Sequence, residues 1–164
     1  MMGPKFLFLM ALFVYCLIAS AENTSLQSPE KILLRIQNEG GKNVLWSLWE
    51  NQEQFGAMLD LAAAADPRWI EVFRQLRPYS DAGASEMIDM SVARALPLTP
   101  ETILNLIGSG FELEFICTSP FIEPEPGIAE RYEEKTLEAL AHIKDPKLKI
   151  LAQKCAESIK LPSQ

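Results

Sequence analysis

The stretch DPRWIEVFRQLRPYSDAGASEMIDMSVARALPLTP, residues 66–100, contains the pattern that decides the fold. It begins and ends with an oxygen-bearing side chain followed directly by proline, at Asp66-Pro67 and Thr99-Pro100. Such an oxygen satisfies a free amide in the first turn of a helix. Proline has no amide to leave unsatisfied, and its ring presets the helical φ angle. Each pair therefore predicts the beginning of a helix.

The same signals recur along the chain, because Ser28-Pro29 and Asp145-Pro146 are further starts of this kind. Apolar residues follow with the i, i+3, i+4, i+7 spacing of one helix face. Three such stripes are Phe55, Met58, Leu59 and Ala62; Trp69, Val72, Phe73 and Leu76; and Leu148, Leu151, Ala152 and Cys155. The sequence therefore predicts an all-α fold. The expected helices are 29–38, 42–49, 52–65, 67–77, 82–95, 100–107, 127–143 and 146–159.

Within residues 66–100, one capped start follows another after about 33 residues that contain two helices and a turn. This order resembles the two-helix unit of HEAT and armadillo solenoids, although those repeats are somewhat longer. Short connections make successive helices pack as antiparallel neighbours. We therefore expect antiparallel helical hairpins, arranged either as a solenoid-like layer or as an irregular bundle.

The first 21 residues have the three parts of a secretory signal peptide. Lys5 is the basic residue, residues 6–18 form the apolar core, and Ala19-Ser20-Ala21 has the small-residue pattern of a cleavage site. The apolar run of about 16 residues is shorter than the roughly 20 that a membrane-spanning helix needs. We expect cleavage after Ala21. Residues 22–164 then form a single helical domain without a membrane anchor.

The chain is acidic, with 22 Asp and Glu against 15 Lys and Arg and a formal charge of −7. Loss of Lys5 with the signal peptide moves this charge to about −8. A nucleic-acid-binding surface needs clustered basic residues. The nearest approach is Lys144, Lys147 and Lys149, which are typical of a solvated helix face. The composition argues against a nucleic-acid partner and favours a protein or peptide with a basic surface.

Two cysteines follow the signal peptide, Cys117 and Cys155. In the oxidising compartment that the signal implies, they allow one intramolecular disulfide bond. Closing a loop of about 39 residues stabilises the fold by on the order of 4 kcal/mol in the chain-entropy model. Two buried free thiols and an intermolecular bridge are the alternatives.

Residues 110–127, GFELEFICTSPFIEPEPG, form the longest segment between predicted helices. Its first half alternates as a strand does, but it also fits one turn of helix, and a lone strand in an all-α chain lacks a partner. We favour the helical turn. The prolines that follow disfavour helix at each preceding residue and predict an extended surface loop. The predicted partner-binding residues of this segment are Glu112, Glu114, Phe121, Glu123 and Glu125.

The run from LWSLWENQ, residues 45–52, through FIEPEPG, residues 121–127, is similar to uncharacterised secreted proteins of Gram-negative bacteria. This resemblance implies a periplasmic setting and brings no site residues. Of the three tryptophans, Trp49 and Trp69 fit apolar helix stripes, whereas Trp46 lies off its stripe. We therefore add Trp46 to the predicted partner contacts.

Signals for catalysis are few. The single histidine, His142, lies near a helix end and lacks a second histidine at metal-ligand spacing, so we expect neither a metal nor another cofactor. Gly108-Ser109-Gly110 is too short for a nucleophile elbow or a phosphate loop. Two of the loop glutamates could in principle serve a cell-wall hydrolase, because glycosidases use a pair of carboxyl groups.

The sequence therefore favours a secreted or periplasmic, non-enzymatic helical module that binds a protein, with an inhibitor or immunity-type protein as one specific form. A peptidoglycan hydrolase that uses paired glutamates is the alternative from another class. A purely structural envelope protein is the third interpretation.

Overall fold

A computed structural model of the 164-residue chain describes residues 26–160. The predicted signal peptide and its cleavage site lie outside this range. The described residues form nine α-helices, one short 3-10 helix and no strand, which confirms the all-α prediction. No helix in this range is long and apolar enough to cross a membrane.

The helices begin close to the predicted positions. Their bounds are α2 Pro29–Glu39, α3 Gly41–Trp49, α4 Gln52–Ala63, α5 Pro67–Leu76, the 3-10 helix η1 Arg77–Tyr79, α6 Ala82–Ala95, α7 Pro100–Leu104, α8 Leu113–Ile116, α9 Ile128–Ala141 and α10 Pro146–Ile159.

The structure confirms all four predicted starts in which an oxygen-bearing residue is followed by proline, and in each of them proline is the first residue of the helix. The side chains of Ser28, Asp66 and Asp145 each accept a hydrogen bond from a backbone amide of the first turn. Thr99 makes no such bond, and its Oγ1 instead contacts the Oγ1 of Thr102 at 2.9 Å. Proline therefore marks the start of α7 without a side-chain cap.

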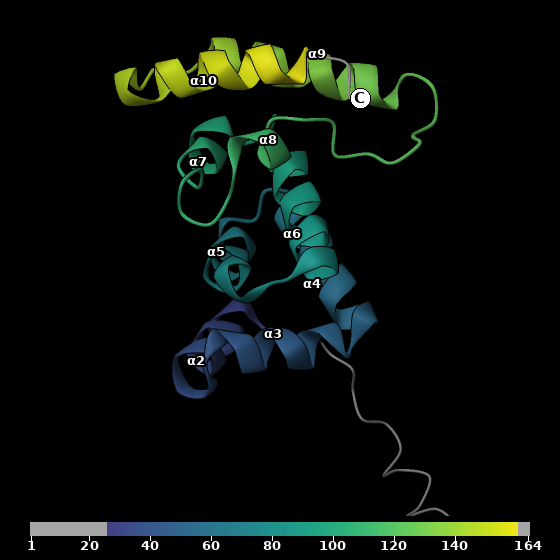
Figure 1. The fold of residues 1–164 in the computed structure, drawn as a ribbon, viewed down its shortest axis with the longest axis vertical. Coiled ribbons are helices and arrows are strands. Elements are labelled where there is room, and N and C mark those ends of the chain that lie inside the picture. Colours follow the sequence, from purple (N-terminus) through teal and green to yellow (C-terminus); the bar gives the residue numbers. More distant parts are fainter. Residues whose placement is uncertain (1–25, 161–164) are drawn as a thin grey trace, which may run out of the picture.

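The helices are arranged in successive layers (Figure 1). Helices α2 and α3 lie at one end, α4, α5 and α6 fill the middle, and α9 and α10 lie across the other end, with α7 and α8 beneath them (Figure 1). A regular HEAT- or armadillo-like repeat within this stack stays a prediction.

One cluster of buried apolar side chains runs through these layers, from Ile32 in α2 to Ile159 in α10. Its middle contains the edge-to-face pair of Phe55 and Phe73, whose ring centroids are 5.8 Å apart. Because the cluster is continuous, the described helices share one core.

Buried polar side chains connect α6 to its neighbours. Ser91 donates its hydroxyl to the carbonyl of Leu59 in α4 at 2.6 Å. The phenol of Tyr132 in α9 donates to the carbonyl of Ala93 at 2.8 Å, and burial raises the pKa of Tyr132 above its ordinary value. Each bond satisfies a polar group that would be costly to bury alone. Helix α6 is thus held on both sides.

The segment between α7 and α8 resolves the ambiguity between strand and helical turn. The predicted helix 100–107 ends already at Leu104. Turns follow, in which backbone amides donate to the carbonyl oxygen three residues earlier. Ile107 and Phe111 form an isolated bridge, with Gly108 and Gly110 at φ +88° and +100° between them. Glycine adopts such angles without steric cost. The helical turn that follows is α8, as we expected.

Candidate functional site

The loop of residues 118–127, which connects α8 to α9, is covalently fastened at its first end. Cys117, the residue after α8, forms a disulfide bond with Cys155 of α10, and both residues are fully buried. The predicted intramolecular bridge is therefore confirmed. It ties the beginning of the loop to the buried face of the last helix, so the loop departs from a defined point.

A second attachment lies three and four residues after Cys117, at Pro120 and Phe121. Pro120 is buried, and its carbonyl accepts a hydrogen bond from Arg94 of α6 at 3.4 Å. The guanidinium of Arg94 lies 5.4 Å from the centre of the Phe121 ring, and that ring meets Tyr132 of α9 edge-on at 5.5 Å. Such aromatic and cation–π contacts each contribute about 0.5 to 1.5 kcal/mol. Phe121 is thus half-buried and attaches the loop to α6 and α9.

Beside this attachment, the loop and α8 form one wall of a groove whose other wall is α6 and the start of η1. The cavity has a volume of about 450 Å³. Its lining residues are Arg77, Ala82, Ser85, Glu86, Asp89, Met90, Phe115, Thr118, Ser119, Phe121 and Ile122. We call it the α6–loop groove. Five of these eleven residues are apolar, and a mixture of apolar side chains with a few polar groups is typical of binding pockets.

Two large apolar side chains stand open to solvent at this groove. Ile122 is 73% exposed and Phe115 of α8 is 50% exposed. Both lie on a segment that the disulfide bond and Phe121 hold in place. Exposed apolar side chains gathered on a fixed surface often mark an interaction site. We regard this pair as the centre of the candidate site.

The groove also contains a nearly buried ion pair. Arg77 Nε and Nη2 donate to the two carboxylate oxygens of Asp89 at 2.7 and 2.8 Å. The hydrogen bond to Asp89 raises the pKa of Arg77, and Glu112 raises it further by its charge. The guanidinium also lies 5.8 Å from the centre of the Phe111 ring. This two-point contact joins η1 to α6 and keeps the groove in one shape.

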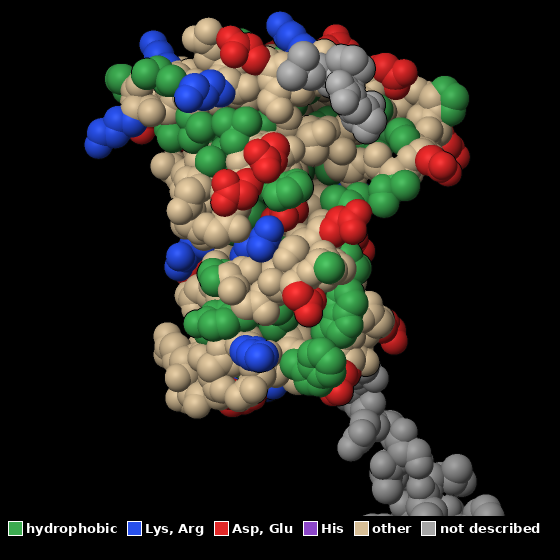
Figure 2. Space-filling view, viewed as in Figure 1, with side chains coloured by type: hydrophobic (Ala, Val, Ile, Leu, Met, Phe, Trp, Pro, Cys, Tyr) green, Lys and Arg blue, Asp and Glu red, His purple; other side chains and the backbone are tan. Residues whose placement is uncertain are grey.

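The surroundings of the groove are acidic. Glu86 lines it, and the predicted contacts Glu112, Glu114, Glu123 and Glu125 are all exposed on the adjoining α8 and loop segments. Glu123 has a positive φ of 45°, an uncommon conformation for a residue other than glycine. Acidic and exposed apolar side chains lie together on the side of the molecule where the loop runs (Figure 2).

The structure places the predicted site residues in two regions. Glu112 directly precedes α8 and Glu114 lies on it, whereas Phe121, Glu123 and Glu125 lie on the loop. Trp46 lies on α3, at the opposite end of the layers (Figure 1), and is 63% exposed, as its position off the helix stripe indicated. A single small partner surface does not reach both regions. Trp46 belongs to a separate feature, described below.

The sequence did not predict Phe115 and Ile122 as contact residues. It predicted Phe121 as a partner contact and not as a residue that attaches the loop to α6 and α9. A signal was present, because adjacent side chains in an extended segment point to opposite sides. If Phe121 packs inward, Ile122 must point outward. The sequence did not say which of the two faces the core, since that depends on Arg94 and Tyr132, which come from distant helices.

Within residues 26–160, the geometry does not support a peptidoglycan hydrolase with paired glutamates or a metal site at His142. The four glutamates predicted as contacts are exposed, whereas the general acid of a glycosidase normally sits in apolar surroundings. His142 caps the end of α9, where its Nδ1 lies 2.7 Å from the carbonyl oxygen of Glu138. The described residues contain no group of three or more His, Cys, Asp or Glu placed to hold a metal ion.

Neither a protein-family model, nor a curated protein, nor a solved structure matches this chain.

Proposed function

We propose that this protein is a secreted, periplasmic interaction module that binds a protein segment in the α6–loop groove. The segment carries a large apolar side chain flanked by Lys or Arg. The observation that carries the proposal is the exposure of Ile122 and Phe115 on a segment held by a disulfide bond and by Phe121. A specific form is an inhibitor or immunity-type protein that presents this rigid acidic surface to an exported enzyme.

Rigidity favours binding because an ordered loop loses little conformational entropy when a partner arrives. The loop is tied to α10 at Cys117 and to α6 and α9 at Phe121. The exposed Ile122 therefore stands in a fixed place. A few anchor side chains contribute most of the binding energy of an interface, and Ile122 and Phe115 are the anchors proposed for this groove.

Charge supports the choice of a basic partner. Glu86 lines the groove, and Glu112, Glu114, Glu123 and Glu125 are exposed along the chain segment that contains α8 and the loop. Arg77 is already paired with Asp89. Carboxylates at the rim of an interface speed association with a basic surface and disfavour an acidic one. Their effect weakens as salt concentration rises.

Two observations support the secreted setting. The first residues have the pattern of a signal peptide, and the structure contains a disulfide bond, which is rare in reducing compartments. The resemblance to secreted proteins of Gram-negative bacteria points to the periplasm in particular.

A random-peptide display selection, followed by titration of the selected peptides against the purified protein, tests the proposal. We expect peptides with one large apolar residue next to Lys or Arg. Their affinity should fall at least tenfold, which is about 1.4 kcal/mol, in Ile122→Asp and in Phe115→Ser. The affinity of Glu86→Gln and Glu123→Gln should depend less on salt than that of the wild type.

Ile150→Asp is the matched control, because Ile150 is 71% exposed on α10 and does not line the groove. Its affinity for the selected peptides should equal that of the wild type. Selected peptides without the expected pattern, or peptides that bind Ile122→Asp as tightly as the wild type, would show the proposal to be wrong.

A further inference from the structure

A second cavity lies at the other end of the molecule, between α3, η1 and the beginning of α6. Its volume is about 470 Å³, within the range of small-molecule sites. Three aromatic rings line it, from Trp46, Trp49 and Tyr79, together with polar side chains of Lys42, Asn43 and Asp81. We call it the aromatic pocket. It shares no lining residue with the α6–loop groove.

Two of these rings present much of their surface to solvent. Trp46 is 63% exposed and Tyr79 is 52% exposed. The indole Nε1 of Trp46 donates to Glu50 Oε1 at 3.0 Å, which orients the ring. Large aromatic side chains are ordinarily buried for most of their area. Their joint exposure around one cavity therefore needs an explanation.

Two glycines allow the rings of Tyr79 and Trp49 to approach the backbone closely. A Cβ atom on Gly41 would lie only 2.3 Å from ring carbons of Tyr79, so that ring rests directly on the backbone of α3. A Cβ atom on Gly83 would lie 3.3 Å from the Trp49 ring, which also meets Phe55 edge-on at 5.7 Å. The rings of Trp49 and Tyr79 are thus placed by close backbone contact, which preorganises the pocket.

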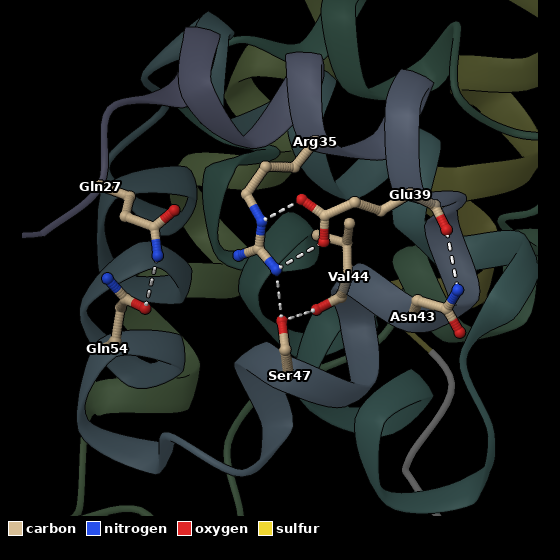
Figure 3. Close-up of polar contacts among 7 residues, drawn as sticks. All are labelled: Gln27, Arg35, Glu39, Asn43, Val44, Ser47 and Gln54. Atoms are coloured by element: carbon tan, nitrogen blue, oxygen red, sulfur yellow. Dashed lines mark hydrogen bonds and ion pairs between the residues drawn. The ribbon is translucent and has the colours of Figure 1, made fainter.

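Polar contacts between α2 and α3 hold the wall of the pocket in position (Figure 3). Arg35 of α2 donates through Nη2 to Ser47 Oγ of α3 at 2.9 Å. Asn43 Nδ2 donates to the carbonyl of Glu39 at 2.8 Å, at the end of α2 (Figure 3). With its amide nitrogen engaged in this way, Asn43 still has its side-chain oxygen as an acceptor.

The charges at the pocket are of both signs. Lys42 brings an ammonium group and Asp81 a carboxylate, and neither side chain makes a hydrogen bond or ion pair with another residue of the described range. Asp81 would attract a cation that Lys42 repels, and Lys42 would attract an anion that Asp81 repels, so this pair favours neither sign of ligand charge. The combination of donor, acceptors and open rings suits a neutral ligand with hydroxyl or amide groups.

We propose that the aromatic pocket binds a neutral glycan. The apolar face of a pyranose ring would stack on the exposed faces of Trp46 and Tyr79, while Lys42, Asn43 and Asp81 would hydrogen-bond to its polar edge. An N-acetylated sugar fits best, because its acetamido group offers an N–H to Asp81 and a carbonyl to Lys42. This site does not depend on the peptide-binding function of the α6–loop groove.

Titration of the purified protein with tetra-N-acetylchitotetraose, followed by isothermal calorimetry and by tryptophan fluorescence, tests the proposal. We expect saturable binding that weakens about tenfold or more in Trp46→Ala and in Tyr79→Ala. Cellotetraose, which lacks the acetamido group, should bind more weakly. Leu98→Ala is the matched control, because Leu98 is 63% exposed and does not line the pocket.

Asp81→Asn and Lys42→Met preserve the aromatic rings and check the polar contacts without risk to the core, since both residues are exposed. Each should weaken binding of the chito-oligosaccharide. Ile122→Asp should bind it as the wild type does, because Ile122 lies in the other cavity. The proposal is overturned if neither sugar binds, if Trp46→Ala and Tyr79→Ala bind unchanged, or if tetramethylammonium binds in place of the sugars.

Discussion

Cys155 of α10 is bonded to Cys117 at the end of α8, across 38 positions of sequence, and the two Cα atoms lie 5.0 Å apart. The bond therefore joins the last helix to the beginning of the loop that carries Ile122. A crosslink over such a span mainly restricts the unfolded chain.

The Cys117→Ser/Cys155→Ser double variant should lose up to about 4 kcal/mol of unfolding free energy. Urea denaturation, monitored by circular dichroism, measures the change. Intact-mass analysis after alkylation without reductant should show no modified thiols in the wild-type mature protein, and two modified thiols would contradict the bond. The single variants serve as controls, since each should lose about as much as the double variant.

Phe121 packs inward and its neighbour Ile122 is exposed, so alanine substitutions at the two positions should differ in their effect on stability. Phe121→Ala removes the contacts with Arg94 and Tyr132 and should destabilise the fold by about 1 to 3 kcal/mol. Ile122→Ala, at a side chain that is 73% exposed, should change stability by no more than about 0.5 kcal/mol. Thermal denaturation of both variants measures this contrast. Equal losses would refute the assignment of Phe121 as an attachment point.

Arg77 and Asp89 form a pair in which the side chains are only 15% and 7% exposed. Arg77→Met leaves the carboxylate of Asp89 without its partner and should cost about 3 kcal/mol. The Arg77→Met/Asp89→Leu double variant should recover part of this loss, because it removes both charges. Urea midpoints of the single and double variants test the idea, and a double variant less stable than the single one would argue against it.

The ion pair between Glu71 and Arg74 predicts a small pH dependence. Hydrogen bonding from Arg74 lowers the pKa of Glu71 below its ordinary value of 4.5. The stabilisation is therefore fully present above pH 4.5 and is lost as the pH falls through the lowered folded-state pKa. Because the two side chains are 38% and 41% exposed, solvent screening keeps the effect below about 1 kcal/mol.

The measurement compares wild type and Glu71→Gln by urea denaturation between about pH 6 and about pH 2. The stability difference should be largest near the upper end and should shrink towards the lower end. Glu134→Gln provides the control, because Glu134 is exposed and forms no ion pair within the described residues. A difference for Glu71→Gln that grows with acidity would contradict the assignment.

Local chemistry made the helices predictable. Asp66-Pro67 and Asp145-Pro146 specify helix starts through atoms within two residues of each other, and the structure confirms both. The exposure of Trp46 followed from its position off the apolar stripe. The helical turn before Cys117 was the favoured alternative because a lone strand lacks partners, and α8 confirms it.

The cavities were not predictable in the same way, because their walls come from residues far apart in sequence. The groove unites Arg77, Met90 and Ile122, and the aromatic pocket unites Trp46 with Tyr79. Each contact depends on how α3, η1, α6 and the loop pack, and a local pattern carries no information on that packing. The sequence hinted at the pocket through Trp46, which lies off its apolar stripe and was a predicted partner contact.

By itself, the sequence determined that the fold is all-α and where most helices begin, and it predicted a bond between Cys117 and Cys155, the two cysteines outside the predicted signal peptide. These properties follow from hydrogen-bonding, φ preferences and periodicity within a few residues, and from the count of cysteines. The tertiary structure alone decided that the bond forms, that Phe121 packs inward against Arg94 and Tyr132, and that Ile122 is left in solvent. Those outcomes depend on which helices meet, and that is settled by the packing of the whole core.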